Sequence, residues 1–89
     1  MSIFNYKAEK LEQSGTSAVY RFWSDYVSDE TVYGVFQVDS NGWNFTIIES
    51  PTDLPPTALD VRAVRALIHK MKKHHLVANS LPETVYFVA

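Results

Sequence analysis

The chain has 89 residues, of which 46% are hydrophobic and 13% aromatic, and it contains three glycines, four prolines and no cysteine. This composition predicts a single globular domain over residues 1–89 and excludes disordered and collagen-like chains. Without cysteine there is no disulfide or thiolate chemistry, which favours a reducing cytoplasm. The start of the chain lacks the apolar segment of an export signal, and no run of about 20 apolar residues predicts a membrane helix. A formal net charge of −2 leaves only local electrostatic attraction to polyanions.

Three segments in the first half of the chain have the composition of β-strands. Residues 3–12 alternate loosely between apolar and polar side chains, and residues 17–27 are rich in β-forming residues. The break at residues 14–16 separates these two segments. A four-residue turn at 28–31 then predicts a hairpin with a third strand at 32–38.

Asn41-Gly42 predicts a second hairpin. A type I′ turn needs positive φ at both central residues, and this pair tolerates it best. The returning strand covers residues 43–49. Three prolines within residues 50–56 remove hydrogen-bond donors and predict a loop there.

One long helix is predicted after this loop. Thr57 and Asp60 form an approximate capping box, and apolar residues recur at helical spacing as far as about His75. The apolar positions are Val61, Val64, Leu67, Ile68 and Met71. Residues 78–82 end the helix, and residues 83–88 are apolar on both faces, which predicts a strand covered on both sides that pairs beside the first. The sequence therefore predicts an α+β fold, an antiparallel sheet of four to five strands in the order β-β-β-β-α-β along the chain, with the helix on one face.

The two hairpins predict which strand residues share a face. The four-residue loop places Trp23 opposite Phe36. The second turn places Val38 opposite Phe45. By the same register Phe36 lies opposite Ile47. The face expected to seat the helix carries Val19, Trp23, Phe36, Val38, Trp43, Phe45 and Ile47. The opposite face gathers Tyr20, Phe22, Tyr26, Tyr33, Val35 and Ile48 among neutral polar residues.

That second face is the predicted partner-binding site. The outer face of an antiparallel sheet is normally polar, whereas aromatic residues mixed with neutral polar ones are typical of interface cores. We therefore expect a small non-enzymatic protein-interaction module, such as an inhibitor, an immunity-type protein or a regulator, that binds another protein or a second copy of itself. The alternatives are that residues 3–12 or the proline loop cover this face, or that its tyrosines lie exposed with their hydroxyls in water.

The helix also has a basic face. Five basic or titratable residues fall within about a 100° arc of the helical wheel, with no acidic residue among them. They are Arg62, Arg65, His69, Lys72 and Lys73. This face is either an ordinary solvated helix surface or an alternative site for nucleic acid or another anionic ligand.

No residue pattern assigns a reaction, a metal or a cofactor. His69, His74 and His75 point about 100° or more apart around the helix, so they cannot converge on one ion. His75 lies on the apolar side and is expected to be half-buried. The chain has no nucleophile elbow, no glycine-rich phosphate loop and no zinc-protease motif, so we name no catalytic residue and an enzyme is not the leading expectation. A small-ligand or catalytic domain with a pocket between helix and sheet is a third alternative, which no particular residue supports.

Overall fold

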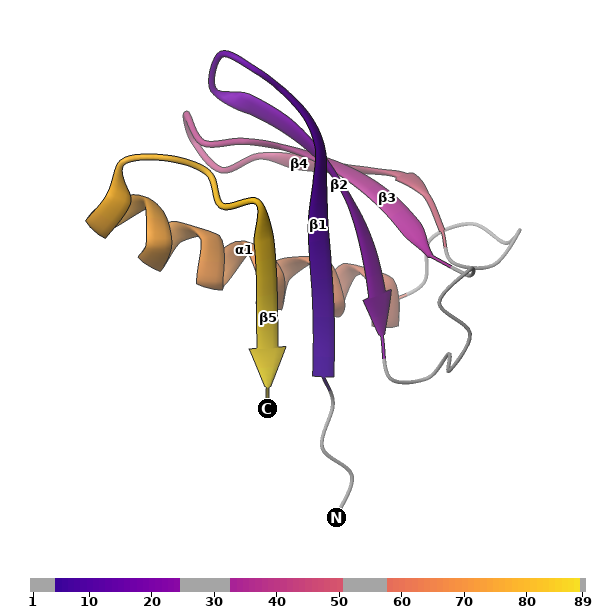
Figure 1. Ribbon diagram of the computed structural model, residues 1–89. Coiled ribbons are helices and arrows are strands. Elements are labelled where there is room, and N and C mark those ends of the chain that lie inside the picture. Colours follow the sequence, from indigo (N-terminus) through magenta and orange to yellow (C-terminus); the bar gives the residue numbers. More distant parts are fainter. Residues whose placement is uncertain (1–4, 25–32, 51–57, 89) are drawn as a thin grey trace.

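Five β-strands and one α-helix make up the part of the chain that the computed structural model describes, residues 5–24, 33–50 and 58–88. In chain order the elements are β1 (Asn5–Ser14), β2 (Ser17–Ser24), β3 (Gly34–Asp39), β4 (Phe45–Glu49), α1 (Ala58–Ala78) and β5 (Thr84–Val88) (Figure 1). The strands form one antiparallel sheet in the order β4-β3-β2-β1-β5. The predicted α+β class and element order are confirmed.

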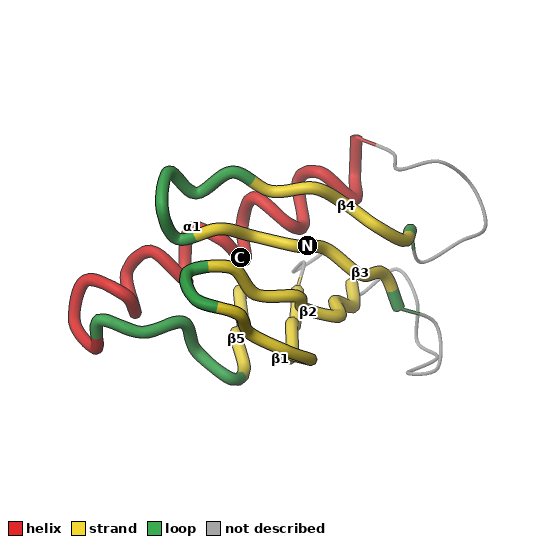
Figure 2. The backbone as a smooth tube through the Cα atoms, turned by 90° about the horizontal axis from the view of Figure 1, so that it is seen from above, coloured by secondary structure: helices red, strands yellow, loops and turns green. Residues whose placement is uncertain are grey.

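The place of α1 follows from the sheet order. It connects β4, at one edge of the sheet, to β5, which pairs with β1 at the other edge as predicted. The helix therefore crosses one face of the twisted sheet (Figures 1 and 2). Its buried residues recur at helical spacing and are Ala63, Val64, Leu67, Ile68 and Met71. Within the described residues, no helix has the length and apolar content needed to cross a membrane.

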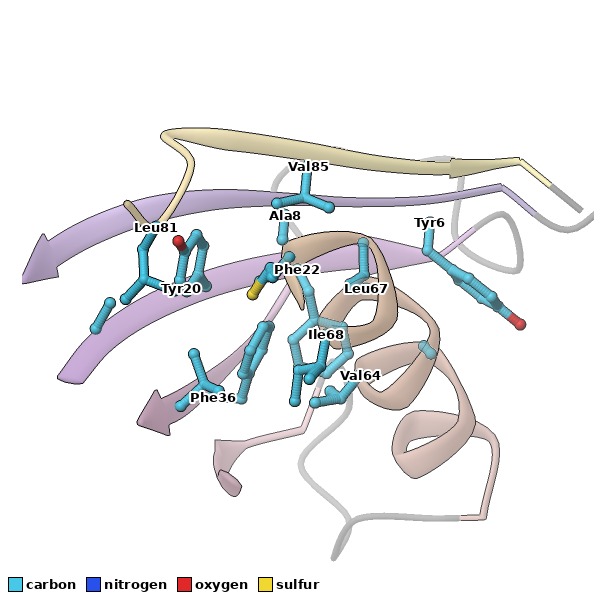
Figure 3. Close-up of a cluster of buried hydrophobic side chains, with 14 residues drawn as sticks. Tyr6, Ala8, Tyr20, Phe22, Phe36, Val64, Leu67, Ile68, Leu81 and Val85 are labelled. Atoms are coloured by element: carbon cyan, nitrogen blue, oxygen red, sulfur yellow. The ribbon is translucent and has the colours of Figure 1, made fainter. Parts of the chain in front are cut away.

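The hydrophobic core lies between α1 and the sheet face that it covers (Figure 3). Because successive side chains of a strand point to opposite faces, each strand contributes alternate residues. Tyr20 and Phe36 stack with ring centroids 5.5 Å apart, and Phe22 meets Phe36 edge-on at 5.6 Å. Full burial of one such side chain stabilises the fold by roughly 1.5–3 kcal/mol. The buried apolar residues of the strands are Tyr6, Ala8, Ala18, Tyr20, Phe22, Phe36, Val38 and Val85.

The segment between α1 and β5 is held by side chains from β1 and β2. The buried Tyr20 hydroxyl donates a hydrogen bond to the backbone oxygen of Pro82 at 2.6 Å. Burial raises the pKa of Tyr20 above its ordinary value, and the negative charge of Glu83 raises it further, so the group remains a donor. Lys10 donates to the Leu81 oxygen at 3.2 Å and pairs with the Glu83 carboxylate at 3.2 Å. These contacts fix where β5 begins.

The pairing of β2 with β3 differs from the predicted hairpin. Tyr20, and not Trp23, lies opposite Phe36. The offset of three residues is odd, so β2 turns its other face toward the helix. The prediction was wrong because more than four residues separate the paired ends of the two strands, Phe22 and Gly34. Tyr20 and Phe22 consequently belong to the core, while Val19 and Trp23 point away from α1.

The pairing of β3 with β4 is as predicted. Val38 lies opposite Phe45, and Phe36 lies opposite Ile47. Both partly buried β4 residues pack against the core from beneath the helix. The short connection between these strands explains the success, because it leaves little freedom in register.

The two strands at the β5 edge depart in detail from expectation. β1 extends past residue 12 to Ser14, and its pairing with β2 slips between Lys10 and Glu12, which leaves Leu11 as the extra residue of a bulge. Val85 is buried, but Tyr86 is 62% exposed. The prediction that the last strand is covered on both faces is therefore wrong, because α1 covers only one of them.

The helix continues past His75 and ends at Ala78. Asn79 has φ 53° and donates its backbone N–H to the His75 oxygen at 2.8 Å, which is the left-handed cap that commonly closes a helix. Thr57, the first residue of the predicted capping box, lies outside the described residues. The last turn leaves Leu76 and Val77 exposed to solvent.

Gly34 provides a test of the β2–β3 register. A Cβ atom there would lie 2.5 Å from Cε1 of Phe22 and 2.8 Å from the Glu49 oxygen. We expect Gly34→Ala to lower the free energy of unfolding by about 1–3 kcal/mol, the usual cost of overpacking. The control is Gly15→Asn, since Gly15 has φ 61° and open space around it, and Asn tolerates this conformation. Urea denaturation measures both, and a Gly34→Ala variant as stable as wild type would contradict the pairing.

Candidate functional site

The predicted partner-binding residues do not share one surface. Tyr20 and Phe22 are fully buried beneath the helix, so their assignment to the open face is wrong. Tyr26 lies outside the described residues. Tyr33 and Ile48 are exposed and Val35 is half-buried, so part of the predicted surface remains accessible. Tyr20 and Phe22 were misassigned because the register of β2 differs from the predicted one. In β2 alone, the face predicted to be open is the face that packs under α1.

In place of Tyr20 and Phe22, other residues form a cluster on the outer face, which is the side of the sheet opposite α1. The outer-face cluster consists of Lys7, Arg21, Trp23, Tyr33 and Tyr86. Its members come from β1, β2, β5 and the residue before β3. The prediction had placed Trp23 under the helix. A signal against that assignment was present in the sequence, because alternation along a strand turns Arg21 to the same face as Trp23, and a charged side chain is rarely buried in a core.

Cations and rings alternate across the outer-face cluster. The Lys7 ammonium lies 5.8 Å from the centre of the Tyr86 ring and 5.3 Å from that of Trp23. The Arg21 guanidinium lies 5.1 Å from the Trp23 ring and 5.7 Å from the Tyr33 ring. The Trp23 and Tyr33 rings are 5.7 Å apart. Each exposed cation–π contact contributes about 0.5–1 kcal/mol, so the cluster holds its rings in place.

Glu9 links the two cations of the outer-face cluster. Its carboxylate accepts hydrogen bonds from Nε and Nη2 of Arg21 at 3.2 and 2.9 Å, and it lies 3.9 Å from Lys7 Nζ. All three side chains are roughly one-third exposed, so solvent screens these pairs and they add about 0–1 kcal/mol each. Their main effect is to orient the cations over the Trp23 ring and to lower the local net charge.

The basic face of α1 lies where the sequence predicted it. Its five residues, Arg62, Arg65, His69, Lys72 and Lys73, are all exposed. Three of them, Arg65, His69 and Lys72, line a groove of about 310 Å³ beside the sheet. Ile68, Trp43 and Phe45 complete this lining. The groove joins the basic helix face to two aromatic residues that sequence reasoning had assigned only to the core.

Trp43 is positioned by an unusual turn. The positive φ values fall at Gly42 (95°) and Trp43 (58°), one residue later than the predicted type I′ turn requires. A bulky residue rarely adopts this conformation, which costs on the order of 1–3 kcal/mol. His75 is half-buried, as predicted, and meets the Trp43 ring edge-on with centroids 5.5 Å apart.

Asp39 stabilises the same turn. Its carboxylate accepts a hydrogen bond from the Asn41 backbone N–H at 2.8 Å, and its own N–H donates to the Asn44 oxygen at 3.0 Å. The Asn41 hydrogen bond, together with one from the Thr16 side chain, holds the pKa of Asp39 below its ordinary value. Ser40 is tied to the neighbouring hairpin through the Thr16 oxygen. The turn that carries Trp43 is therefore fixed at both ends.

Among the described residues, no group of three or more His, Asp or Glu side chains is placed to hold a metal ion. No family model, curated protein or solved structure matches the chain. Function therefore has to be inferred from the geometry of the outer-face cluster and the groove.

The Asp39 turn should respond to pH in a defined direction. Because the folded pKa lies below the ordinary value of 3.8, the carboxylate stabilises the turn above that pH and ceases to do so as the pH falls through the folded pKa. Carboxyl NMR titration should therefore give an Asp39 pKa below 3.8. Asp39→Ala should speed hydrogen exchange of the Asn41 amide. Asp39→Asn keeps a side-chain oxygen as acceptor and should protect the Asn41 amide better than Asp39→Ala does. An Asp39 that titrates at or above its ordinary value would contradict this account.

Proposed function

We propose that the chain is a non-enzymatic protein-interaction module that binds a partner protein, or a second copy of itself, through the outer face of its sheet. The observation that carries the proposal is the outer-face cluster, in which aromatic rings and cations are held together on the face that α1 leaves open. No described element packs over these residues. The absence of cysteine supports a reducing cytoplasm as the setting.

The chemistry of the cluster favours a protein as the occupant. Tryptophan, tyrosine and arginine are the residue types most enriched among those that dominate binding energy at protein interfaces. Trp23 is half-buried, with Lys7 and Arg21 over its ring and Tyr33 beside it. Because these contacts already restrict the side chains, little conformational entropy remains to be lost on binding.

The electrostatics of the cluster point the same way. Glu9 pairs with Arg21 and approaches Lys7, so the face presents both signs of charge instead of an uncompensated cationic patch. A surface of this kind suits a partner with its own mixed polar rim around apolar side chains. Val35, half-buried on the same face, and the exposed Ile48 at the β4 edge extend the apolar area.

Charge introduced on the outer face should weaken the association. We expect the double variant Tyr33→Glu, Val35→Lys to remain folded, because neither side chain belongs to the buried core. Its binding should weaken by about 2 kcal/mol or more, as for other residues central to an interface. Light scattering at increasing concentration tests self-association. A photo-cross-linking residue in place of Tyr86 tests capture of a different protein.

The matched control introduces the same charges elsewhere. Leu76→Glu with Val77→Lys changes two apolar residues of the last helical turn that are 86% and 91% exposed. This control should associate like wild type. If the wild-type protein stays monomeric and no cross-link from position 86 depends on Tyr33 and Val35, the proposed interface is wrong.

A further inference from the structure

The groove between α1 and the β3–β4 hairpin has a basic wall. Arg65, His69 and Lys72 occupy positions i, i+4 and i+7 of the helix, so they lie in one row along its side. All three are exposed, and no described acidic side chain forms an ion pair with them. This distinguishes them from Lys7 and Arg21, whose charges Glu9 offsets. The wall is therefore complementary to an anion.

The opposite wall of the groove is aromatic. Trp43 comes from the turn and Phe45 from the start of β4, and both are half-buried. Both residues also pack against the hydrophobic core, and the part of each side chain that stays accessible lines the groove. Trp43 is also held in its strained conformation by the Asp39 turn and by contact with His75. An aromatic ring beside cations fits a ligand that has both a planar ring system and a negative charge.

We propose that this groove binds a nucleotide, with the base against Trp43 and the phosphate between Arg65, His69 and Lys72. Bases stack on aromatic side chains, and arginine and lysine are the usual partners of phosphate. The volume of about 310 Å³ lies at the small end of the usual range for ligand sites, about 300–1,000 Å³, and suits one nucleotide unit. The nucleotide is either free or one unit of a single strand. This site does not depend on the outer face, which lies on the other side of the sheet.

The experiment is an NMR titration of the whole chain at low salt with adenosine monophosphate. Amide shifts should concentrate at the turn and along residues 65–72, and they should weaken as salt is raised. Ribose 5-phosphate and adenosine, which each lack one half of the ligand, should bind at least about tenfold more weakly. A short oligodeoxyadenylate distinguishes a free nucleotide from a unit of a single strand. If it binds more strongly than the mononucleotide, the ligand is a strand, and if it binds equally or more weakly, the ligand is the free nucleotide.

Two variants and one control locate the site. Trp43→Asn removes the ring but tolerates the left-handed backbone, and Arg65→Gln with Lys72→Gln removes two cations. Each should weaken binding of adenosine monophosphate about tenfold or more. Lys70→Gln removes a cation from the same helix where it lies over Phe87, away from the groove, and should leave binding unchanged.

Several outcomes would overturn the proposal. One is that neither the mononucleotide nor the oligonucleotide causes amide shifts at low salt. Another is that the groove variants bind adenosine monophosphate like wild type. Inorganic phosphate or a polyglutamate peptide that binds as tightly as adenosine monophosphate would also overturn it, because neither ligand uses the aromatic wall.

Discussion

A single helix can cover only one face of a five-stranded sheet, and the rest of this structure depends on that constraint. α1 runs from the β4 edge to the β5 edge and seals the face that contains Tyr20, Phe22 and Phe36. The register of β2 decides which of its side chains take part. Because Tyr20 and Phe22 point inward, Arg21 and Trp23 must point outward, and the outer-face cluster arises from the same pairing that builds the core. The register of β2 therefore determines both the composition of the core and that of the candidate interface.

The outer-face cluster and the groove differ in how their charges are compensated. On the outer face, Glu9 and the rings of Trp23 and Tyr33 engage the cations within the molecule. Along the groove, the cations of α1 face aromatic side chains and no carboxylate from the described residues. Internal compensation favours a contact through shape and apolar area, whereas uncompensated charge favours an anionic ligand whose affinity falls with salt. The two surfaces are therefore suited to different kinds of partner.

The turn that carries Trp43 connects the fold to the groove. Its left-handed backbone is unfavourable for a bulky side chain, so it persists only because neighbouring contacts hold it. The Asp39 carboxylate fixes the start of the turn, Ser40 is bound to the β1–β2 connection, and His75 packs against the indole. Contacts within the turn, from the β1–β2 connection and from α1 thus place one aromatic ring.

The sequence alone determined the α+β class, the order of elements, the apolar stripe of α1 and its exposed basic face, because these depend on local periodicity and charge. It also determined the register of β3 with β4, since a short connection leaves little choice. Only the tertiary structure decided which face of β2 packs against α1. Pairing across the longer connection between β2 and β3 depends on contacts with β1 and α1 that periodicity does not encode. For the same reason the sequence misplaced Tyr20, Phe22 and Trp23. The groove is lined by Trp43 and Arg65, and residues so far apart in the chain come to line one groove only once α1 has packed against the sheet.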